Sequence, residues 1–262
     1  MENLDMNFSN YMVRFGLLLV IGLFVASLSG WSVEADKDLI LYYPLDKDTS
    51  DVSGEKNDGE LKGKVSLEKG KFGKAIKLMP DQPILIEPSD SLHGDIFLEP
   101  FSYTLWIKPD FKGTTWEHLW RSLPSAVGHN TLFINKDQGL VSYRGRVGGW
   151  TTLCQTDGGL IKKDTWANIT LTSDTKKFKI YIDGDLKKET DYKKTDGKNA
   201  EYRIGGSGGE TYAGLVDEVA FYARALSEAE IKSIAKVGME VFLSVDAKGK
   251  LTRNWAKIKT EY

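Results

Sequence analysis

The segment Gly214–Ile231, GLVDEVAFYARALSEAEI, contains a predicted strand followed directly by a predicted helix, and this order decides the fold class. Its first half alternates with a period of two, so Leu215, Asp217, Val219 and Phe221 would share one face of the strand. The alternation predicts that the carboxylate of Asp217 lies in register with core-facing side chains.

The second half of this segment has the start and stop signals of a short helix. Ser227 is followed three residues later by Glu230, the spacing of a capping box in which each side chain satisfies a backbone amide of the first turn. Ile231 and Ile234 form one apolar stripe. Gly238 stands where a residue with left-handed backbone is expected to end the helix.

The rest of the chain favours strands. Glycine is abundant, with 26 residues. Two alternating runs between Trp166 and Ile182 precede Asp183-Gly184, a dipeptide typical of tight hairpin turns. Short strands separated by frequent turns indicate a sandwich or barrel. The sequence therefore predicts an all-β fold of two antiparallel sheets with one short helix near its C-terminal side.

Several segments carry, in order, a resemblance to a known family: Leu39–Gly59, Phe72–Leu78, Phe101–Pro109, Trp166–Gly184, Arg203–Gly206 and Gly214–Ile231. Together they resemble the laminin G-like domains of the concanavalin A-like lectin and glucanase jelly rolls. The resemblance extends from Asp38 to Gly238 and implies a jelly-roll β-sandwich.

The N-terminal segment has the pattern of a secretory signal peptide. Arg14 precedes the apolar run Phe15–Leu28, and small residues follow it. We expect cleavage after Ala35, with Ser29 as the alternative site. The run is shorter than the roughly 20 residues of a membrane-spanning helix, so a retained anchor is the less favoured interpretation. The chain is thus divided into a signal peptide (1–35), a jelly-roll domain (36–238) and a C-terminal extension (239–262).

The extension differs in character from the domain. Val241, Leu243 and Val245 alternate as one predicted strand, and Leu251, Trp255 and Ile258 supply a second apolar set. The extension is predicted to add edge strands to the sandwich or to dock on a partner.

Composition limits the classes of partner that the protein could bind. A net charge of −2, from 35 basic and 37 acidic side chains, argues against nucleic-acid binding. Cys154 is the only cysteine, so an exported chain would lack an intramolecular disulfide. We expect Cys154 to act as a small buried hydrophobic residue.

Two carboxylates are candidate calcium ligands. The loop at Asp46 is not an EF-hand, because Asp51 stands where glycine is required and Asn57 where glutamate is required. The resemblance implies an ion where the first and last strands run side by side, held here by Asp46 and Asp217, with Asn57 as a further oxygen donor. Ca²⁺ suits such an oxygen-rich site, in a structural role. The alternative is that Asp46 caps a turn and Asp217 pairs with a lysine or backbone amides.

Catalytic patterns are weak. The string Gly205–Gly209 satisfies the serine-hydrolase elbow only formally, because no helix is predicted after it. The hydrolases of this jelly roll place two carboxylates on one strand as Glu-x-Asp-x-x-Glu, and the chain has no such string. Adjacent Asp217 and Glu218 would point to opposite faces. The histidines have no zinc-ligand spacing and are predicted to be loop residues: His93, His118 and His129.

The region 111–150 combines aromatic and cationic residues and is the candidate ligand surface. Indole rings stack on the apolar face of a sugar, and arginine supplies planar donors for hydroxyls or carboxylates. The alternative is that Trp120 and Trp150 belong to the core or cover its rim. The predicted ligand-binding residues are Trp116, Trp120, Tyr143, Arg144, Arg146 and Trp150.

These observations predict an exported, non-catalytic binding module, secreted or extracytoplasmic, that recognises carbohydrate or an extracellular protein and contains structural calcium. One alternative is a glycan-acting hydrolase of the same fold, which would need a pair of carboxylates facing one groove. The other is a structural or adhesion module, which would need a large flat apolar patch.

Overall fold

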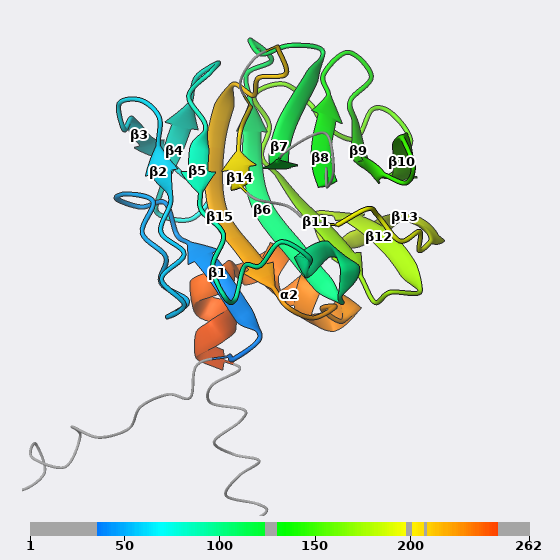
Figure 1. The fold of residues 1–262 in the computed structure, drawn as a ribbon. Coiled ribbons are helices and arrows are strands. Elements are labelled where there is room, and N and C mark those ends of the chain that lie inside the picture. Colours follow the sequence, from blue (N-terminus) through cyan, green and yellow to red (C-terminus); the bar gives the residue numbers. More distant parts are fainter. Residues whose placement is uncertain (1–35, 124–129, 198–200, 207–208, 246–262) are drawn as a thin grey trace, which may run out of the picture. The chain divides into compact units, whose positions relative to one another are not determined.

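The computed structural model describes residues 36–123, 130–197, 201–206 and 209–245, which form a sandwich of two antiparallel sheets (Figure 1). The predicted all-β jelly roll is therefore confirmed. The predicted signal peptide, His129 and the apolar set Leu251, Trp255 and Ile258 lie outside the described residues.

The first sheet is built around the strand that the sequence singles out, β15 (Gly214–Tyr222). On one side β15 pairs with β6, and on the other side it pairs with β4 along its first half and with β1 along its second half. The other strands of this eight-stranded sheet are β13 (Asp185–Asp191), β12 (Lys177–Ile182), β11 (Ala167–Ser173), β6 (Phe101–Pro109), β4 (Lys74–Leu78), β3 (Leu67–Lys69) and β1 (Leu39–Tyr43).

The second sheet has seven strands. In spatial order they are β10 (Trp150–Gln155), β9 (Leu140–Arg146), β8 (Asn130–Asn135), β7 (Trp116–Leu123), β14 (Glu201–Ile204), β5 (Ile84–Ile86) and β2 (Glu60–Leu61). A 3₁₀ turn at Ile96–Leu98 precedes β6.

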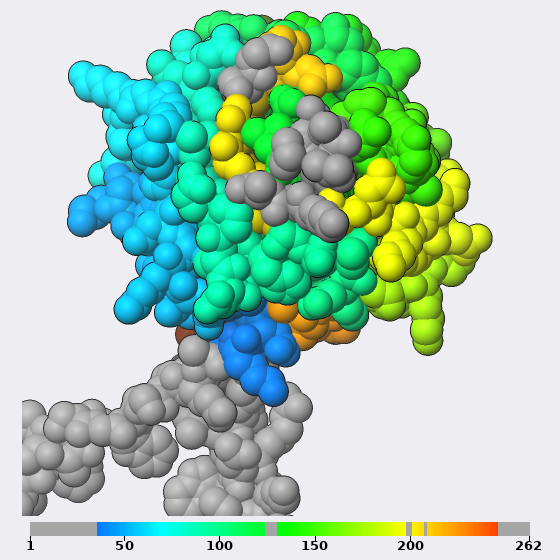
Figure 2. Space-filling model, in the orientation of Figure 1, coloured from blue at the N-terminus to red at the C-terminus, as the bar shows by residue number. Residues whose placement is uncertain are grey.

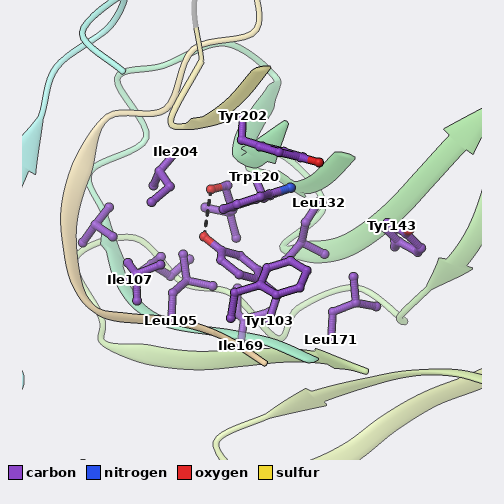
Figure 3. Packing of buried hydrophobic residues seen from close by; sticks show 14 of the residues in the cluster. Tyr103, Leu105, Ile107, Trp120, Leu132, Tyr143, Ile169, Leu171, Tyr202 and Ile204 are labelled. Carbon is purple, nitrogen blue, oxygen red and sulfur yellow. Dashed lines mark hydrogen bonds between the residues drawn. The ribbon is translucent and has the colours of Figure 1, made fainter. Parts of the chain in front are cut away.

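The main core lies between the sheets and is rich in aromatic rings (Figure 3). Tyr103 of β6 and Trp120 of β7 approach with ring centroids 4.8 Å apart, and the Tyr103 hydroxyl donates to the Leu119 carbonyl oxygen at 3.3 Å. Burial of such large rings supplies much of the stabilisation of a sandwich. Cys154 is buried in this core, as predicted.

A second apolar cluster covers the other face of the eight-stranded sheet, under α2 (Glu228–Val237). The predicted capping box of Ser227 and Glu230 is present, and Gly238 ends the helix with a φ of 82°. Ile231 and Ile234 pack with Leu39 and other residues of the first strand. Figures 1 and 2 show β1 (blue) lying against the α2 segment (orange).

Residues 239–245 are helical, so the predicted strand at Val241–Val245 is wrong. Met239 and Phe242 are three residues apart and therefore lie on one helical face, which is buried in the second cluster. Val241 and Val245 are exposed instead. Contact with the existing cluster favours a helix over the local alternation of apolar residues.

Two β-bulges shift the phase of the side chains. In β15 the register against β6 shifts between Asp217 and Ala220, and Glu218 has a φ of 53°. As a result Val216 and Val219 both face the core, and the predicted register of Asp217 with core-facing residues is wrong. Glu218 does not face the core either, because it bonds to residues of the second cluster, so the two carboxylates do not point to opposite faces of the sheet as predicted.

In β7 the register against β8 shifts between His118 and Trp120. The extra residue, Leu119, turns Trp120 into the core and leaves His118 and Arg121 on the outer face. His118 is thus a buried strand residue, and its prediction as a loop residue is wrong.

Candidate functional site: a groove on the seven-stranded sheet and an acidic corner on β15

A row of polar side chains crosses the outer face of the seven-stranded sheet. Direct cross-strand neighbours connect Arg203 of β14 to Arg121 of β7, Thr131 of β8, Arg144 of β9 and Thr152 of β10. The chain neighbours of this row on β7, β8 and β9 belong to the core, so the row itself points away from it. Since adjacent strands lie about 4.8 Å apart, the Cα atoms of Arg121 and Arg144 are separated by roughly 10 Å.

Three members of this row, Arg121, Arg144 and Thr152, line a groove of about 470 Å³. Trp150, at the start of β10, is 52% exposed there. We call this feature the arginine groove; it is lined by Arg121, Phe133, Arg144, Trp150, Thr151, Thr152 and Glu210.

Arg144 is held in place by aromatic rings. Its guanidinium carbon lies 3.9 Å from the centroid of the Trp116 ring and 5.5 Å from that of Phe133. Its Nε donates to the Ser142 hydroxyl oxygen at 3.3 Å. Burial lowers the pKa of the Arg144 guanidinium, and the nearby carboxylate of Glu210 acts in the opposite direction.

Arg121 has no such anchor. Its Nε is buried and has no hydrogen-bond partner within the described ranges. The hydroxyl of Thr131, its neighbour on β8, is likewise buried without a partner among those residues. Burial lowers the pKa of Arg121, Glu210 raises it, and the positive charge of Arg203 lowers it further.

Glu210 lies at the edge of the groove and is attached to His118. The Nδ1 of His118 lies 2.6 Å from the Glu210 carbonyl oxygen, which can only accept, so Nδ1 is the protonated donor. The Nε2 lies 3.4 Å from a carboxylate oxygen of Glu210. The His118 ring also packs on Phe133, with centroids 4.4 Å apart.

The structure brings together only part of the predicted ligand surface. Arg144 and Trp150 line the groove, and Trp116 lies behind Arg144 as the ring on which its guanidinium packs. Arg146 lies opposite Trp150 across β9 and β10, with its Nε 3.8 Å from a carboxylate oxygen of Asp196.

Trp120 and Tyr143 were also predicted to bind ligand, and both predictions are wrong. Both side chains are buried between the sheets. Tyr143 precedes Arg144 in a strand, so the two must point to opposite faces. Trp120 would share the face of Trp116 by strict alternation, but the bulge at Leu119 reverses its direction.

Sequence reasoning missed Arg121, Thr131, Phe133 and Glu210. Phe133 and Thr131 alternate with the core residues Leu132 and Ile134, a signal that could have placed them on the outer face. Nothing local marks Arg121, because its direction depends on the bulge.

A second group of charged side chains lies at β15 of the eight-stranded sheet, on the side that faces away from the main core. One carboxylate oxygen of Asp217, Oδ2, accepts the backbone N–H groups of Lys71 at 2.8 Å and Phe72 at 3.1 Å. Asp46 Oδ1 accepts the N–H of Lys74 at 2.6 Å. Both carboxylates therefore hold the same turn, and we call this feature the acidic corner.

The two carboxylates of the acidic corner differ in burial, since Asp217 is buried and Asp46 is exposed. Gly73 has a φ of 53°, and a Cβ added there would lie 2.2 Å from Asp46 Oδ1. The second oxygen of Asp217, Oδ1, is buried without a hydrogen-bond partner among the described residues. Burial raises the pKa of Asp217 to about 7, the two amides oppose this, and the charges of Glu218 and Asp46 add to it.

Asn57 does not belong to the acidic corner, so its prediction as a metal ligand is wrong. Its Nδ2 donates to the Ile40 carbonyl oxygen at 2.6 Å and to the Ser91 hydroxyl at 3.0 Å, and its Oδ1 accepts from Ser89. These bonds use the amide to join three chain segments.

Of the three predicted calcium ligands, the structure leaves Asp46 and the unbonded oxygen of Asp217 as candidate donors. The described residues contain no group of three or more His, Cys, Asp or Glu side chains that could hold a metal. Carbonyl oxygens and water would have to complete the six to eight ligands of Ca²⁺. The buried, unbonded Oδ1 of Asp217 is the observation that fits a cation.

Family membership follows from comparison of the sequence with known families. The profile of a laminin G-like family, described as "Concanavalin A-like lectin/glucanases superfamily", matches residues 88–232, more than half of the chain. The chain belongs to this family. A comparison with curated proteins gave no match.

Solved structures share the fold at low sequence identity. Domain 4 of AbnA, a GH43 extracellular arabinanase from Geobacillus stearothermophilus solved with arabinotriose, aligns with a TM-score of 0.63 and 22% identity, over 76% of this chain and 98% of that domain. The binding domain of Paraclostridial Mosquitocidal Protein 1 aligns with a TM-score of 0.62 and 21% identity, over 76% of this chain.

The receptor binding domain of a botulinum neurotoxin C/D mosaic serotype aligns with a TM-score of 0.62 and 19% identity, over 76% of this chain. The chain spans about half the length of the two toxin domains, with coverages of 52% and 51%. None of the helices in the described part of this chain is long and apolar enough to cross a membrane.

Proposed function

We propose that this protein is a non-catalytic module that binds saccharides in the arginine groove. The observation that carries the proposal is an exposed indole beside uncommitted polar donors: Trp150 is 52% exposed, and the guanidinium groups of Arg121 and Arg144 face the same groove. An indole ring stacks on the apolar face of a sugar while planar donors bind its oxygens.

The comparisons support binding as the general function. One fold neighbour was solved with arabinotriose, and the others are described as binding or receptor binding domains. A shared fold hosts many functions, so the proposal rests on the groove of this chain and uses the neighbours only as support.

We do not propose glycoside hydrolysis in this groove, because its described lining lacks the pair of carboxylates that such hydrolysis requires. Among its described lining residues, Glu210 is the single acidic side chain. Glycosidases of the common type use two carboxylates, one on each side of the scissile bond. Release of reducing ends from a bound oligosaccharide, abolished by Glu210→Gln, would favour the alternative of a glycan-acting enzyme.

The experiment that tests the proposal is a glycan-array measurement on the full chain, followed by titration calorimetry with the best ligand. Trp150→Ala is expected to weaken binding about tenfold, since loss of one stacking ring costs on the order of 1–2 kcal/mol. Leu186→Ala, an exposed apolar residue on β13 of the other sheet, is the matched control and should leave affinity unchanged.

A blank array would contradict saccharide binding and would favour an extracellular protein partner or a structural module. Binding that survives Trp150→Ala would contradict the assignment to the groove.

We also propose that calcium binds at the acidic corner in a structural role. Asp46 and the unbonded oxygen of Asp217 would hold the ion, which would neutralise the buried charge of Asp217. A higher melting temperature in calcium than in chelator, lost in Asp46→Ala, is the expected result. Equal melting temperatures would favour the alternative in which backbone amides alone satisfy these carboxylates.

We also propose that the protein is exported from the cell. The arginine at position 14 and the apolar run after it support a signal peptide, and a secreted or extracytoplasmic location suits recognition of external glycans. N-terminal sequencing of the protein from culture medium should give a chain that begins at Asp36, or at Gly30 if the alternative site is used.

A further inference from the structure

We propose that the ligand of the arginine groove is an acidic saccharide whose carboxylate is bound by Arg121 and Arg144. This inference rests on the proposed function and names the ligand class of the same site.

The groove has an excess of positive charge. Two of its lining residues are arginines and one is a glutamate. The single carboxylate of Glu210 acts on both arginines, whose pKa it raises, but its one negative charge can balance only one of the two guanidinium groups. Arg203, the next member of the row, is bonded to Glu201 and is not counted in this excess.

The two arginines keep their donors free. Among the described residues the buried Nε of Arg121 has no hydrogen-bond partner, and the Arg144 side chain makes one hydrogen bond, from Nε to Ser142. Its terminal nitrogens are left for a ligand while the Trp116 ring fixes the plane of the guanidinium. A guanidinium held in one orientation loses less side-chain entropy when it binds a ligand.

The position of Thr131 shows where the charges converge. It lies on the strand between the two arginines, as the direct cross-strand partner of both. Its buried hydroxyl has no partner within the described ranges. With Cα atoms roughly 10 Å apart, the two arginine side chains can approach one group from both sides above this hydroxyl.

A carboxylate fits these donors better than a neutral hydroxyl does. Guanidinium groups bind carboxylates through two parallel hydrogen bonds, and such charge-assisted bonds are about twice as strong as neutral ones. Partial burial strengthens them, because water competes less in a groove than on an open surface. The lowered pKa of both arginines has the same cause, their removal from water.

A polyanion such as nucleic acid is a poorer fit. Its binding requires an extended basic surface that contacts many phosphates, and the chain has a net charge of −2. The positive charge is confined to a groove of about 470 Å³, which suits one or a few sugar units.

The test compares acidic oligosaccharides with their own neutral derivatives on the full chain. The probes are oligosaccharides of galacturonate, glucuronate, mannuronate and sialic acid, each beside the carboxyl-reduced form that carries an alcohol instead. A sulfated neutral oligosaccharide forms a third arm that separates carboxylate from sulfate recognition.

We expect at least one acid to bind about tenfold or more tightly than its reduced form, with an affinity that falls as salt is raised. Arg144→Gln and Arg121→Gln should each remove most of this preference. Lys163→Gln, which removes an exposed charge from the loop before β11, is the matched control and should preserve it.

Three outcomes would overturn the inference. Equal affinity for acid and reduced forms, still lost in Trp150→Ala, would leave saccharide binding intact but would show that the arginines bind hydroxyls. Preference for the sulfated arm alone would replace carboxylate by sulfate. Failure of every probe, acidic and neutral, would contradict the ligand class and the proposed function together.

Discussion

The acidic corner and the arginine groove both contain charged side chains withdrawn from water, but their hydrogen bonds differ. At the corner one oxygen of Asp217 accepts two backbone N–H groups, and the adjacent Glu218 accepts from the Tyr42 hydroxyl and from the backbone of Met239. In the groove the buried Nε of Arg121 has no hydrogen-bond partner among the described residues. Removing an acceptor that the fold uses, such as Asp217 Oδ2, leaves backbone donors without a partner, whereas a polar atom that the fold leaves unbonded, such as Arg121 Nε or Asp217 Oδ1, is available to a ligand or ion.

Glu218, next to Asp217 on β15 but outside the acidic corner, also connects separate parts of the fold. Its carboxylate joins β1, through Tyr42, to the helical segment 239–245, through Met239. Loss of such bonds should lower the free energy of unfolding. Loss of the groove arginines should lower the affinity for the ligand.

The largest expected effect is on stability, in Asp217→Ala. This change leaves the part-buried amides of Lys71 and Phe72 without their acceptor and opens a cavity at a buried position of β15, so we expect a loss of about 2–4 kcal/mol in the free energy of unfolding, measured by urea denaturation. Asp217→Asn keeps an acceptor oxygen and should lose less. Arg144→Gln should change stability by less than about 1 kcal/mol; a loss as large as that of Asp217→Ala would remove the distinction between the two regions.

The next effect concerns pH. Burial raises the pKa of Glu117, at the start of β7, to about 8, with Lys136 opposing the rise and Asp110 adding to it. The unfolded chain ionises this group near pH 4.5, so between pH 4.5 and 8 the folded state binds more protons and stability falls as pH rises.

In Glu117→Gln the total fall in the free energy of unfolding between pH 4.5 and 8.5 should be smaller than in wild type by on the order of 2 kcal/mol. Glu68→Gln, an exposed carboxylate on β3, is the control and should leave the slope unchanged. A decline of equal slope in wild type and Glu117→Gln would show that other groups, such as Asp217, account for it.

A smaller loss of stability is expected in Asn57→Ala, and this variant tests whether Asn57 belongs to the acidic corner. Asn57→Ala removes the hydrogen bonds to Ile40, Ser89 and Ser91 and should cost about 1–2 kcal/mol of stability. For Asn57→Ala, the difference between the melting temperatures in calcium and in chelator should be the same as for wild type. A reduced calcium response in this variant would return Asn57 to the metal site.

The smallest expected effect is in Trp116→Ala. The ring holds the Arg144 guanidinium at 3.9 Å but does not line the groove itself, so its loss should weaken binding of an acidic saccharide by about three- to fivefold. The affinity for a carboxyl-reduced probe should not change. An equal loss for both probes would mean that the ring contacts the sugar directly.

The sequence was most informative where local chemistry is sufficient. The capping box of Ser227 and Glu230, the Asp183-Gly184 hairpin and the glycine at 238 depend on residues a few positions apart, and each is present in the structure. The helical conformation of 239–245 was missed because contact with the second apolar cluster, contributed by distant strands, outweighs the local alternation.

The candidate site was predictable only in part, and the two bulges explain the failures. Arg144 and Trp150 could be found from residue type alone. The directions of Trp120 and Arg121 depend on the extra residue in β7, and those of Asp217 and Glu218 on the extra residue in β15. A bulge arises from pairing with a partner strand, so alternation within one strand cannot reveal it.

The sequence by itself determined the fold class, the family resemblance and the helix that follows β15, because hydrophobic period, turn residues and caps act over short distances. Only the tertiary structure decided which charges meet. It aligned Arg121, Thr131 and Arg144 across three strands and seated the turn at Lys71–Lys74 on Asp46 and Asp217. The physical reason is that cross-strand register places residues far apart in the chain next to one another, and that register is set by the packed sheets as a whole.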